Sequence, residues 1–283
     1  MTITTSDFVY VAELLRRESA IALSPGKEYL VNARLLPVAR AIGLPSVAAL
    51  VATLRAGAAA ALRRRVVEAL TTNETSWFRD REPFRALSGI VLPELIGAGR
   101  PGRPLRIWSA ACSTGQEPYS IAITLREHLP PGVRCEVVAS DLSTAVLARA
   151  EAGRFSQLEI NRGMPAPLLV KYFVREGAHW LVSPALRRDM TFSRVNLVEP
   201  HPPLRPFDVI FLRNVLIYFD LDAKRAVLKQ LGRLLNPGGW LFLGVAETTL
   251  GLSDDFERDA SGKTSAYRLR AVDRAPAGAL RVG

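Results

Sequence analysis

The sequence is short of cysteine and of long apolar runs. Only two cysteines occur among 283 residues. Cys112 and Cys135 both lie in apolar, strand-like stretches, which favours reduced core thiols over a disulfide or a metal site. No run reaches the roughly eighteen apolar residues of a membrane span, and the polar N-terminus is unlike a secretory signal. We therefore expect a cytoplasmic protein with no membrane insertion and no metal.

Lysine is also scarce, although the chain is basic. The formal net charge of +10 admits a polyanionic partner, but 32 of the 37 basic residues are arginine and are scattered along an Ala- and Leu-rich chain. The densest cluster, Arg63 to Arg65, lies in a helical stretch without interleaved aromatic residues, which favours a solvated helix face over a single-strand platform. We therefore expect no nucleic-acid partner.

The first quarter of the chain has helical periodicity. Apolar residues recur at helical spacing from residue 7 to about 72, and proline-containing turns at 24–26 and 43–45 punctuate them. The pattern predicts an all-helical N-terminal domain over residues 1–72. We expect a linker and a first helix over 73–103, and an α/β domain over 104–272. A tail, 273–283, is expected to be disordered from Ala275.

From residue 105 onward, strand-like and helical stretches alternate. The predicted strands are "LRIWSAA", "CEVVASD", "FDVIFLRN" and "GWLFLGV", and the predicted helices lie near 117–128, 143–151 and 222–235. This alternation is typical of βαβ units and predicts an α/β fold with a parallel sheet. Three runs between 168 and 197, "LVKYFVRE", "HWLVSP" and "MTFSRVNL", either form a small antiparallel patch or are not strands. A final strand is expected near "SAYRLR", antiparallel to its neighbours.

The turn after the first predicted strand, "WSAACSTGQEPYS", predicts a ligand-binding loop. The small residues Ala110 and Ala111 let a ligand approach the backbone. Gly115 is the one glycine there, whereas a dinucleotide-binding turn has three. Glu117 places a negative charge where a phosphate would lie. The loop therefore favours a neutral or cationic ligand.

Polar residues also end other predicted strands. Asp141 ends the second, where an acid typically accepts hydrogen bonds from both hydroxyls of a ribose. The alternative is a helix cap, and both roles can coexist if Ser143 caps the helix. Asn214 lies in an apolar run and needs a partner, for which a bound ligand is one candidate. With the Pro-Gly-Gly turn at 237–239, the pattern looks like a Rossmann-like S-adenosylmethionine-dependent methyltransferase, whose sulfonium suits Glu117.

A set of longer motifs resembles one family in particular. The motifs, in chain order, are "ALTTNETSWFRDREPF", "WSAACSTGQEPYSIAI", "ASDLSTAVLARA", "FSRVNL" and "FDVIFLRNVLIYFD". Their order and spacing closely resemble the CheR family of chemotaxis receptor glutamate O-methyltransferases, over about residues 8 to 270. The resemblance implies a Rossmann-like class I methyltransferase domain preceded by an all-α domain, with a small antiparallel β-subdomain at about 168–197. It also implies methylation of glutamate side chains on the signalling helices of methyl-accepting chemotaxis receptors, with S-adenosylmethionine as cofactor.

The resemblance and the strand-end pattern together predict the site residues. The resemblance implies cofactor contacts at Asn73, Thr75, Arg79, Glu117, Asp141, Asn196, Leu197, Asn214 and Val215, and the strand ends add Ala111, Gly115 and Arg213. Arg79 would lie one helical turn after Thr75 and could hold a carboxylate of the cofactor or of the acceptor. Tyr218 and Tyr119 are candidates for lining the methyl channel. The alternative role of this segment is a capping box of Thr71 and Glu74.

Two features leave details of the partner open. The run "FVREGAHWLV" is shorter than the glycine-rich loop of family members that dock on a receptor's C-terminal tether peptide, so we hypothesise a tether-independent enzyme. The helix that resembles the receptor-facing helix has few bases, which leaves receptor contact through Arg34 and Arg40 open.

A monomer is the default expectation. The alternatives are a non-catalytic S-adenosylmethionine-binding adaptor or sensor and a nucleic-acid methyltransferase, although "NVLI" is unlike the N-P-P-Y motif of amino-group methylators.

Overall fold

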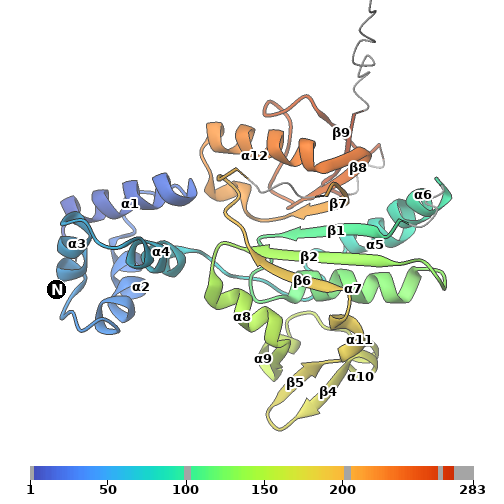
Figure 1. The fold of residues 1–283 in the computed structure, drawn as a ribbon, viewed down its shortest axis with the longest axis horizontal. Coiled ribbons are helices and arrows are strands. Elements are labelled where there is room, and N and C mark those ends of the chain that lie inside the picture. The colour runs from blue at the N-terminus through green and yellow to red at the C-terminus, as the bar shows by residue number, and fades with distance from the viewer. Residues whose placement is uncertain (1–2, 99–102, 201–204, 261–263, 271–283) are drawn as a thin grey trace, which may run out of the picture.

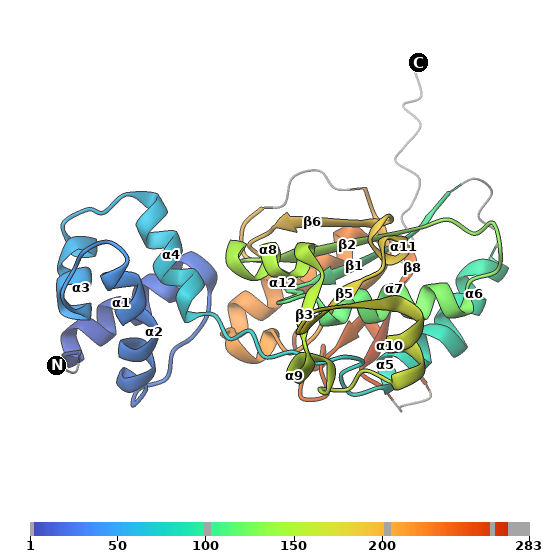
Figure 2. The same ribbon diagram turned by 90° about the horizontal axis from the view of Figure 1, so that it is seen from below.

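The computed structural model describes residues 3–98, 103–200, 205–260 and 264–270 (Figure 1). A helical N-terminal part lies beside an α/β part, and residues 71–81 lead from one to the other (Figure 2). None of the helices in these ranges is both long and apolar enough to cross a bilayer. The segment from Ala275, expected to be disordered, lies outside the described residues.

The N-terminal helices each bury one apolar face. They are α1 (Thr5–Ser19), α2 (Glu28–Arg40), α3 (Val47–Arg55) and α4 (Ala60–Leu70). In α1 the buried face includes Phe8, Val11 and Leu15, whose spacing places them on one side of a helix. The side chains of Thr4 and Ser46 cap α1 and α3 by accepting backbone N–H groups. The four faces meet in one core, which confirms the predicted helical domain.

The described strands of the main sheet form a mostly parallel array. Their order is β6 (Met190–Arg194), β2 (Cys135–Asp141), β1 (Leu105–Ala110), β7 (Phe207–Leu212), β8 (Leu235–Leu243), β10 (Ala266–Leu269) and β9 (Phe256–Arg258). Neighbours from β6 to β8 pair in parallel, and β10 is antiparallel to both β8 and β9. The predicted parallel sheet and the final antiparallel strand are therefore confirmed.

Helices cover both faces of this sheet (Figure 1). They are α5 (Glu82–Ala86), a π-helical turn (Leu87–Val91), α6 (Leu92–Gly97), α7 (Gln116–His128), α8 (Thr144–Ala152) and α12 (Leu221–Leu234). Val209 and Phe211 of β7 pack in the cluster that includes α7 and the π-helical turn, whereas Ile210 and Leu212 pack in the cluster that includes α12. Every residue of β7 is buried, because a central parallel strand has no face toward water.

The strand order creates a switch point between β1 and β7. From β1 the chain moves outward through β2 to β6, and it then returns to the other side of β1 to form β7. The connections after β1 and β7 therefore leave the sheet in opposite directions. A crevice opens between them at the carboxyl ends of the strands, which is where α/β sheets bind ligands.

The small antiparallel sheet differs from its prediction. It consists of β3 (Arg154–Ser156), β5 (His179–Val182) and β4 (Phe173–Glu176), accompanied by α9 (Gln157–Ile160), α10 (Ala166–Tyr172) and α11 (Pro184–Arg187). The predicted span of 168–197 thus misses β3. The run "MTFSRVNL" was wrongly grouped with the small sheet, because its residues form β6 and pair in parallel with β2. Strand composition alone does not identify the partner strand.

The Pro-Gly-Gly segment at 237–239 also differs from its prediction as a turn. It lies inside β8, where the register with β7 shifts between Phe207 and Val209. The segment is thus an irregularity within the strand, and β8 begins directly where α12 ends.

Polar contacts hold the two parts of the chain together. Glu68 of α4 accepts hydrogen bonds from the backbone N–H (3.1 Å) and the hydroxyl (2.9 Å) of Thr144, at the start of α8. Arg16 of α1 pairs with Asp220 at 3.0 Å, and the backbone N–H of Ala22 donates to the carbonyl of Tyr218. The N-terminal part is thus docked against the carboxyl edge of the sheet.

Trp77 anchors the connecting segment to the small antiparallel sheet. Its side chain is 2% exposed and makes edge contacts with Phe155 and Phe173, at centroid distances of 4.8 and 5.3 Å. We predict that Trp77→Ala lowers the free energy of unfolding by about 3–5 kcal/mol, since it leaves a large cavity. Chemical denaturation measures this loss. Trp180→Ala, at a half-buried position on β5, is the control and should cost less; equal losses would contradict the anchoring role.

Candidate functional site

A cavity lies at the carboxyl edge of the sheet, beside the switch point. Its walls come from the loops after β1, β2, β6 and β7, from residues 70–75, from Ser19 at the end of α1 and from Ile21 beyond it. The space inside it, open mouth included, is about 990 Å³. Of the predicted site residues, Asn73, Thr75, Arg79, Ala111, Glu117, Asp141, Asn196, Leu197, Arg213, Asn214, Val215 and Tyr218 line this cavity.

Gly115 does not line the cavity. It begins α7 with φ +99°, and a Cβ there would lie 3.0 Å from the Cβ of Ala150 in α8. Its structural role is therefore the close approach of α7 to α8. Tyr119 is likewise a core residue, whose hydroxyl donates to the Ala150 carbonyl (2.9 Å) and whose pKa is raised to about 12, mainly by burial.

Asp141 joins the loop after β1 to the loop after β2. One carboxylate oxygen accepts the backbone N–H of Ser113 (2.8 Å), and the other accepts that of Ser143 (3.0 Å). Ser143 is the N-cap residue of α8, but its side chain makes no capping hydrogen bond, so Asp141 itself holds this turn. The backbone N–H of Leu142 also stabilises the ionised carboxylate, whose remaining acceptor capacity is available to a ligand hydroxyl. The carboxylate is 6% exposed, and burial raises its pKa.

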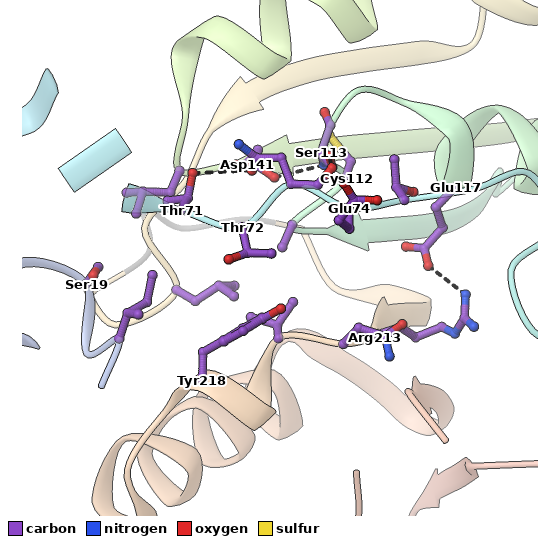
Figure 3. A pocket seen from close by; sticks show the side chains of 18 of the residues that line it. Ser19, Thr71, Thr72, Glu74, Cys112, Ser113, Glu117, Asp141, Arg213 and Tyr218 are labelled. Carbon is purple, nitrogen blue, oxygen red and sulfur yellow. Dashed lines mark hydrogen bonds and ion pairs between the residues drawn. The ribbon is translucent and has the colours of Figure 1, made fainter. Parts of the chain in front are cut away.

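Arg213 and Glu117 form a buried ion pair at one end of the cavity (Figure 3). Their N–O distance is 3.0 Å, and Glu117 also accepts the Ser109 hydroxyl at 2.8 Å. Burial raises the pKa of Glu117, and the Arg213 charge opposes that rise. Arg213 also pairs with Asp80 at 2.6 Å and donates to the carbonyl of Arg79 at 2.8 Å. Its guanidinium is therefore engaged by protein groups.

The segment that carries Arg79 is a strained turn. Phe78, Asp80 and Arg81 have φ values of +47°, +65° and +51°, a region that side-chain-bearing residues rarely adopt. The predicted helical relation between Thr75 and Arg79 is wrong, because residues 72–76 lie outside helices and 77–80 form a turn. The two bonds from Arg213 to Arg79 and Asp80 hold this turn on the edge of the cavity.

The capping box of Thr71 and Glu74 is also wrong. The hydroxyl of Thr71 donates to the carbonyl of Glu68 (2.7 Å), and the carboxylate of Glu74 pairs with Arg162 of the small subdomain (2.6 Å). Extended backbone here brings residues 71–75 along the cavity wall. A short polar motif predicts a helix start only when an apolar helix face follows it, and none does here.

Arg34 and Arg40 of α2, both candidates for receptor contact, have different surroundings in the structure. Arg34 donates to the carbonyls of Leu70 (2.7 Å) and Thr71 (2.8 Å), so it holds the end of α4 and the start of the cavity wall. Arg40 is exposed at the last turn of α2. Arg34 therefore has a structural role, whether or not it also meets a partner.

Several residues of the site were not among the predicted contacts, although Ser113 lies in the predicted ligand-binding loop. Ser113, Thr72 and Leu142 line the cavity, and Asp80 and Glu247 hold residues that do. Glu247 follows β8 in a stretch without a motif, and its partners are backbone N–H groups, which no side-chain pattern reveals. Tyr218 lies across the cavity from Asp141 (Figure 3). Within the described residues, no group of three or more His, Cys, Asp or Glu side chains could hold a metal ion.

The fold and this cavity define the class of the protein. The described sheet, with its switch-point cavity and an acid at the end of β2, has the architecture of an S-adenosylmethionine-dependent methyltransferase. Two family models match the chain: "CheR methyltransferase, all-alpha domain" over residues 6–71 and "CheR methyltransferase, SAM binding domain" over 73–264. The chain belongs to the CheR methyltransferase family.

Curated relatives are similar along nearly the whole chain. "Chemotaxis protein methyltransferase 1" of Pseudomonas aeruginosa is 41% identical over 281 residues, covering 95% of this chain and 100% of the relative. "Chemotaxis protein methyltransferase Cher2" of Pseudomonas putida is 40% identical, covering 89% and 93%. "Chemotaxis protein methyltransferase" of Vibrio parahaemolyticus is 38% identical, covering 95% and 99%.

The raised pKa of Asp141 predicts a pH-dependent cofactor affinity. If Asp141 binds the ribose as the sequence predicts, the hydroxyls donate to its ionised form and protonation removes an acceptor. A raised pKa brings this loss closer to neutrality than for an exposed aspartate. Calorimetry with S-adenosylhomocysteine should show a rising Kd as pH falls from about 7 to about 5. Asp141→Asn should bind more weakly with a shallower pH dependence. A wild-type Kd that stays constant over this range would contradict the prediction.

Proposed function

We propose that the protein is a protein-glutamate O-methyltransferase that methylates glutamate side chains on the cytoplasmic helices of methyl-accepting chemotaxis receptors, for sensory adaptation. The observation that carries the proposal is the convergence of predicted cofactor residues from five chain segments on one cavity. The names of the curated relatives support chemotaxis as the process. We further propose a cytoplasmic monomer that acts without a metal, without membrane insertion and without nucleic acid.

The residues of the cavity fit S-adenosylmethionine. Three carboxylates line it, Glu74, Glu117 and Asp141, against the guanidinium groups of Arg79 and Arg213. The excess of carboxylates over guanidinium groups suits a cofactor with a positively charged sulfonium better than a negatively charged pyrophosphate. The remaining acceptor capacity of Asp141 suits a ribose hydroxyl, and the apolar walls at Leu142 and Leu197 suit an uncharged ring.

The proposed reaction requires the acceptor carboxylate to be positioned and does not require proton transfer. When bound, S-adenosylmethionine supplies an electrophilic methyl group, which a glutamate oxygen takes up to give a methyl ester and S-adenosylhomocysteine. A glutamate with an ordinary pKa of about 4.3 is already ionised at neutral pH, so no general base is needed. The chain must instead orient the carboxylate and exclude water from it.

Two residues at the cavity suit this positioning role. Arg79 uses one guanidinium nitrogen to bind the carbonyl of Glu74 (3.0 Å), which leaves further N–H donors for a carboxylate of the acceptor or of the cofactor. Tyr218 lines the cavity with its ring and carries a hydroxyl donor. Its backbone carbonyl accepts from Ala22, so the N-terminal domain holds it in place.

Methyl transfer to receptors tests the proposal directly. Membranes with the cognate chemoreceptor, incubated with methyl-labelled S-adenosylmethionine, should gain label that mild alkali releases as methanol. Asp141→Ala should raise the Kd for S-adenosylhomocysteine by about 10- to 100-fold, because hydrogen bonds to a charged group are lost, and should abolish most labelling. Asp189→Ala is the matched control, since Asp189 pairs with Arg126 away from the cavity.

The two alternatives predict other outcomes. No label on receptors, despite tight binding of S-adenosylhomocysteine, would favour a non-catalytic adaptor or sensor. Alkali-stable label on RNA or DNA would favour a nucleic-acid methyltransferase. Either result would remove the support for glutamate methylation while leaving the cofactor site intact.

We also propose that receptor recognition is independent of a C-terminal tether peptide. The hairpin between β4 and β5 is closed by Gly177 and Ala178, which gives it no long glycine-rich loop. We therefore predict no measurable binding of the isolated C-terminal pentapeptide of the cognate receptor in calorimetry. Receptors with and without their last five residues should be methylated at the same rate. Tight pentapeptide binding would contradict this prediction.

A further inference from the structure

The segment after β7 carries five residues of the cavity, and the loop at its start is held in an unusual conformation. Asn214, Val215 and Tyr218 line the cavity from this loop. Asn214 has φ +61°, in the left-handed region that costs a non-glycine residue free energy. Such a conformation persists only where neighbouring groups fix it.

The carboxylate of Glu247 supplies these fixing contacts. One oxygen accepts the backbone N–H groups of Asn214 (2.8 Å) and Gly244 (2.6 Å). The other accepts those of Val215 (2.8 Å) and Ile217 (3.3 Å). Four N–H donors use the four acceptor positions of a carboxylate, so a glutamine could not replace it without loss.

The carboxylate is buried without a cationic partner. Glu247 is 6% exposed, and no Lys or Arg of the described ranges forms an ion pair with it. A buried charge is costly unless hydrogen bonds compensate it. Its four donors therefore have to stay in place for the charge to be tolerated, and this requirement couples the side chain to the backbone of the loop.

At Gly244 the backbone that follows β8 closely approaches the loop after β7. A Cβ at Gly244 would lie 2.7 Å from the carboxylate of Glu247, 2.8 Å from the side-chain nitrogen of Asn214 and 2.9 Å from its backbone nitrogen. These distances are too short for a real Cβ. The loop after β7 thus packs directly against the backbone of Gly244, and the Glu247 carboxylate accepts hydrogen bonds from both.

We propose that Glu247 is a positioning residue, which sets the backbone of the loop after β7 so that Asn214 and Val215 meet the cofactor and Tyr218 faces the acceptor. It acts through the backbone and does not itself line the cavity. The acceptor part of this role rests on the proposed receptor methylation, whereas the cofactor part does not.

The test compares Glu247→Gln with a matched buried carboxylate. The amide nitrogen would face two backbone N–H donors, so two hydrogen bonds are lost at nearly constant shape. We expect the Kd for S-adenosylhomocysteine, measured by calorimetry, to rise about tenfold and kcat to fall about 10²-fold, while the variant remains folded. Asp208→Asn is the control: Asp208 is also buried and accepts a backbone N–H, that of Arg106 (2.9 Å), but outside the cavity.

A structural role and a positioning role give different results. Asp208→Asn should lower Tm and leave the Kd and kcat of the folded protein unchanged. Glu247→Gln with wild-type Kd and kcat, whatever its Tm, would overturn the proposal. A raised Kd in Glu247→Gln, together with no receptor labelling by the wild-type protein, would overturn the proposed function and support the positioning role.

A second variant keeps the test decisive if Glu247→Gln does not fold. Gly244→Ala introduces a methyl group against the carboxylate and the loop, so it should also raise the Kd for S-adenosylhomocysteine. Where both single variants fold, the double variant should bind no more than about threefold worse than the weaker-binding single variant, because both changes disturb one contact. Wild-type affinity in Gly244→Ala, or full additivity in the double variant, would count against the proposal.

Discussion

The buried guanidinium of Arg213 connects three parts of the site that are distant in the sequence. Its side chain is 1% exposed, and a charge at such a position is costly unless it is paired and hydrogen-bonded. Asp80 and Glu117 pair with it, and the carbonyl of Arg79 accepts a further bond. The strained turn before α5, the first turn of α7 and the end of β7 are therefore fixed together. The position of the Arg79 backbone and the position of the Glu117 carboxylate at the cavity both depend on these contacts with Arg213.

The N-terminal domain completes the site as well as covering it. Residues 70–75 form one wall, and Arg34 of α2 binds the carbonyls at the start of that wall. Asn196, predicted as a cofactor contact, donates to the carbonyl of Glu18 (2.7 Å) at the end of α1. Movement of the helical domain would therefore change the cavity directly. A partner that contacts α2 would act on a helix that is bonded to the cavity wall.

The sequence predicts the parallel sheet and its ligand-binding edge because both follow from local patterns. Apolar runs of strand length alternate with amphipathic helices, and Asp141 and Asn214 interrupt or end such runs. The pairing of β6 with β2 could not be predicted, since strand composition does not specify a partner. The turn at 77–80 could not be predicted either. Its conformation is imposed by Arg213, which lies more than a hundred residues further along the chain.

Glu247 escaped prediction for a related reason, and its comparison with Asp141 shows a common principle. Asp141, at the end of β2, holds the backbone of Ser113 in the loop after the neighbouring β1, where Ser113 has φ +52°. Glu247, after β8, holds the backbone of Asn214 in the loop after the neighbouring β7, where φ is +61°. The two strands beside the switch point thus each end in a strained loop that a buried carboxylate from the next strand outward stabilises. Each carboxylate binds backbone N–H groups, so it fixes the shape of the loop directly through the main chain. The geometry of the cavity therefore depends on two acids, of which only Asp141 lines it.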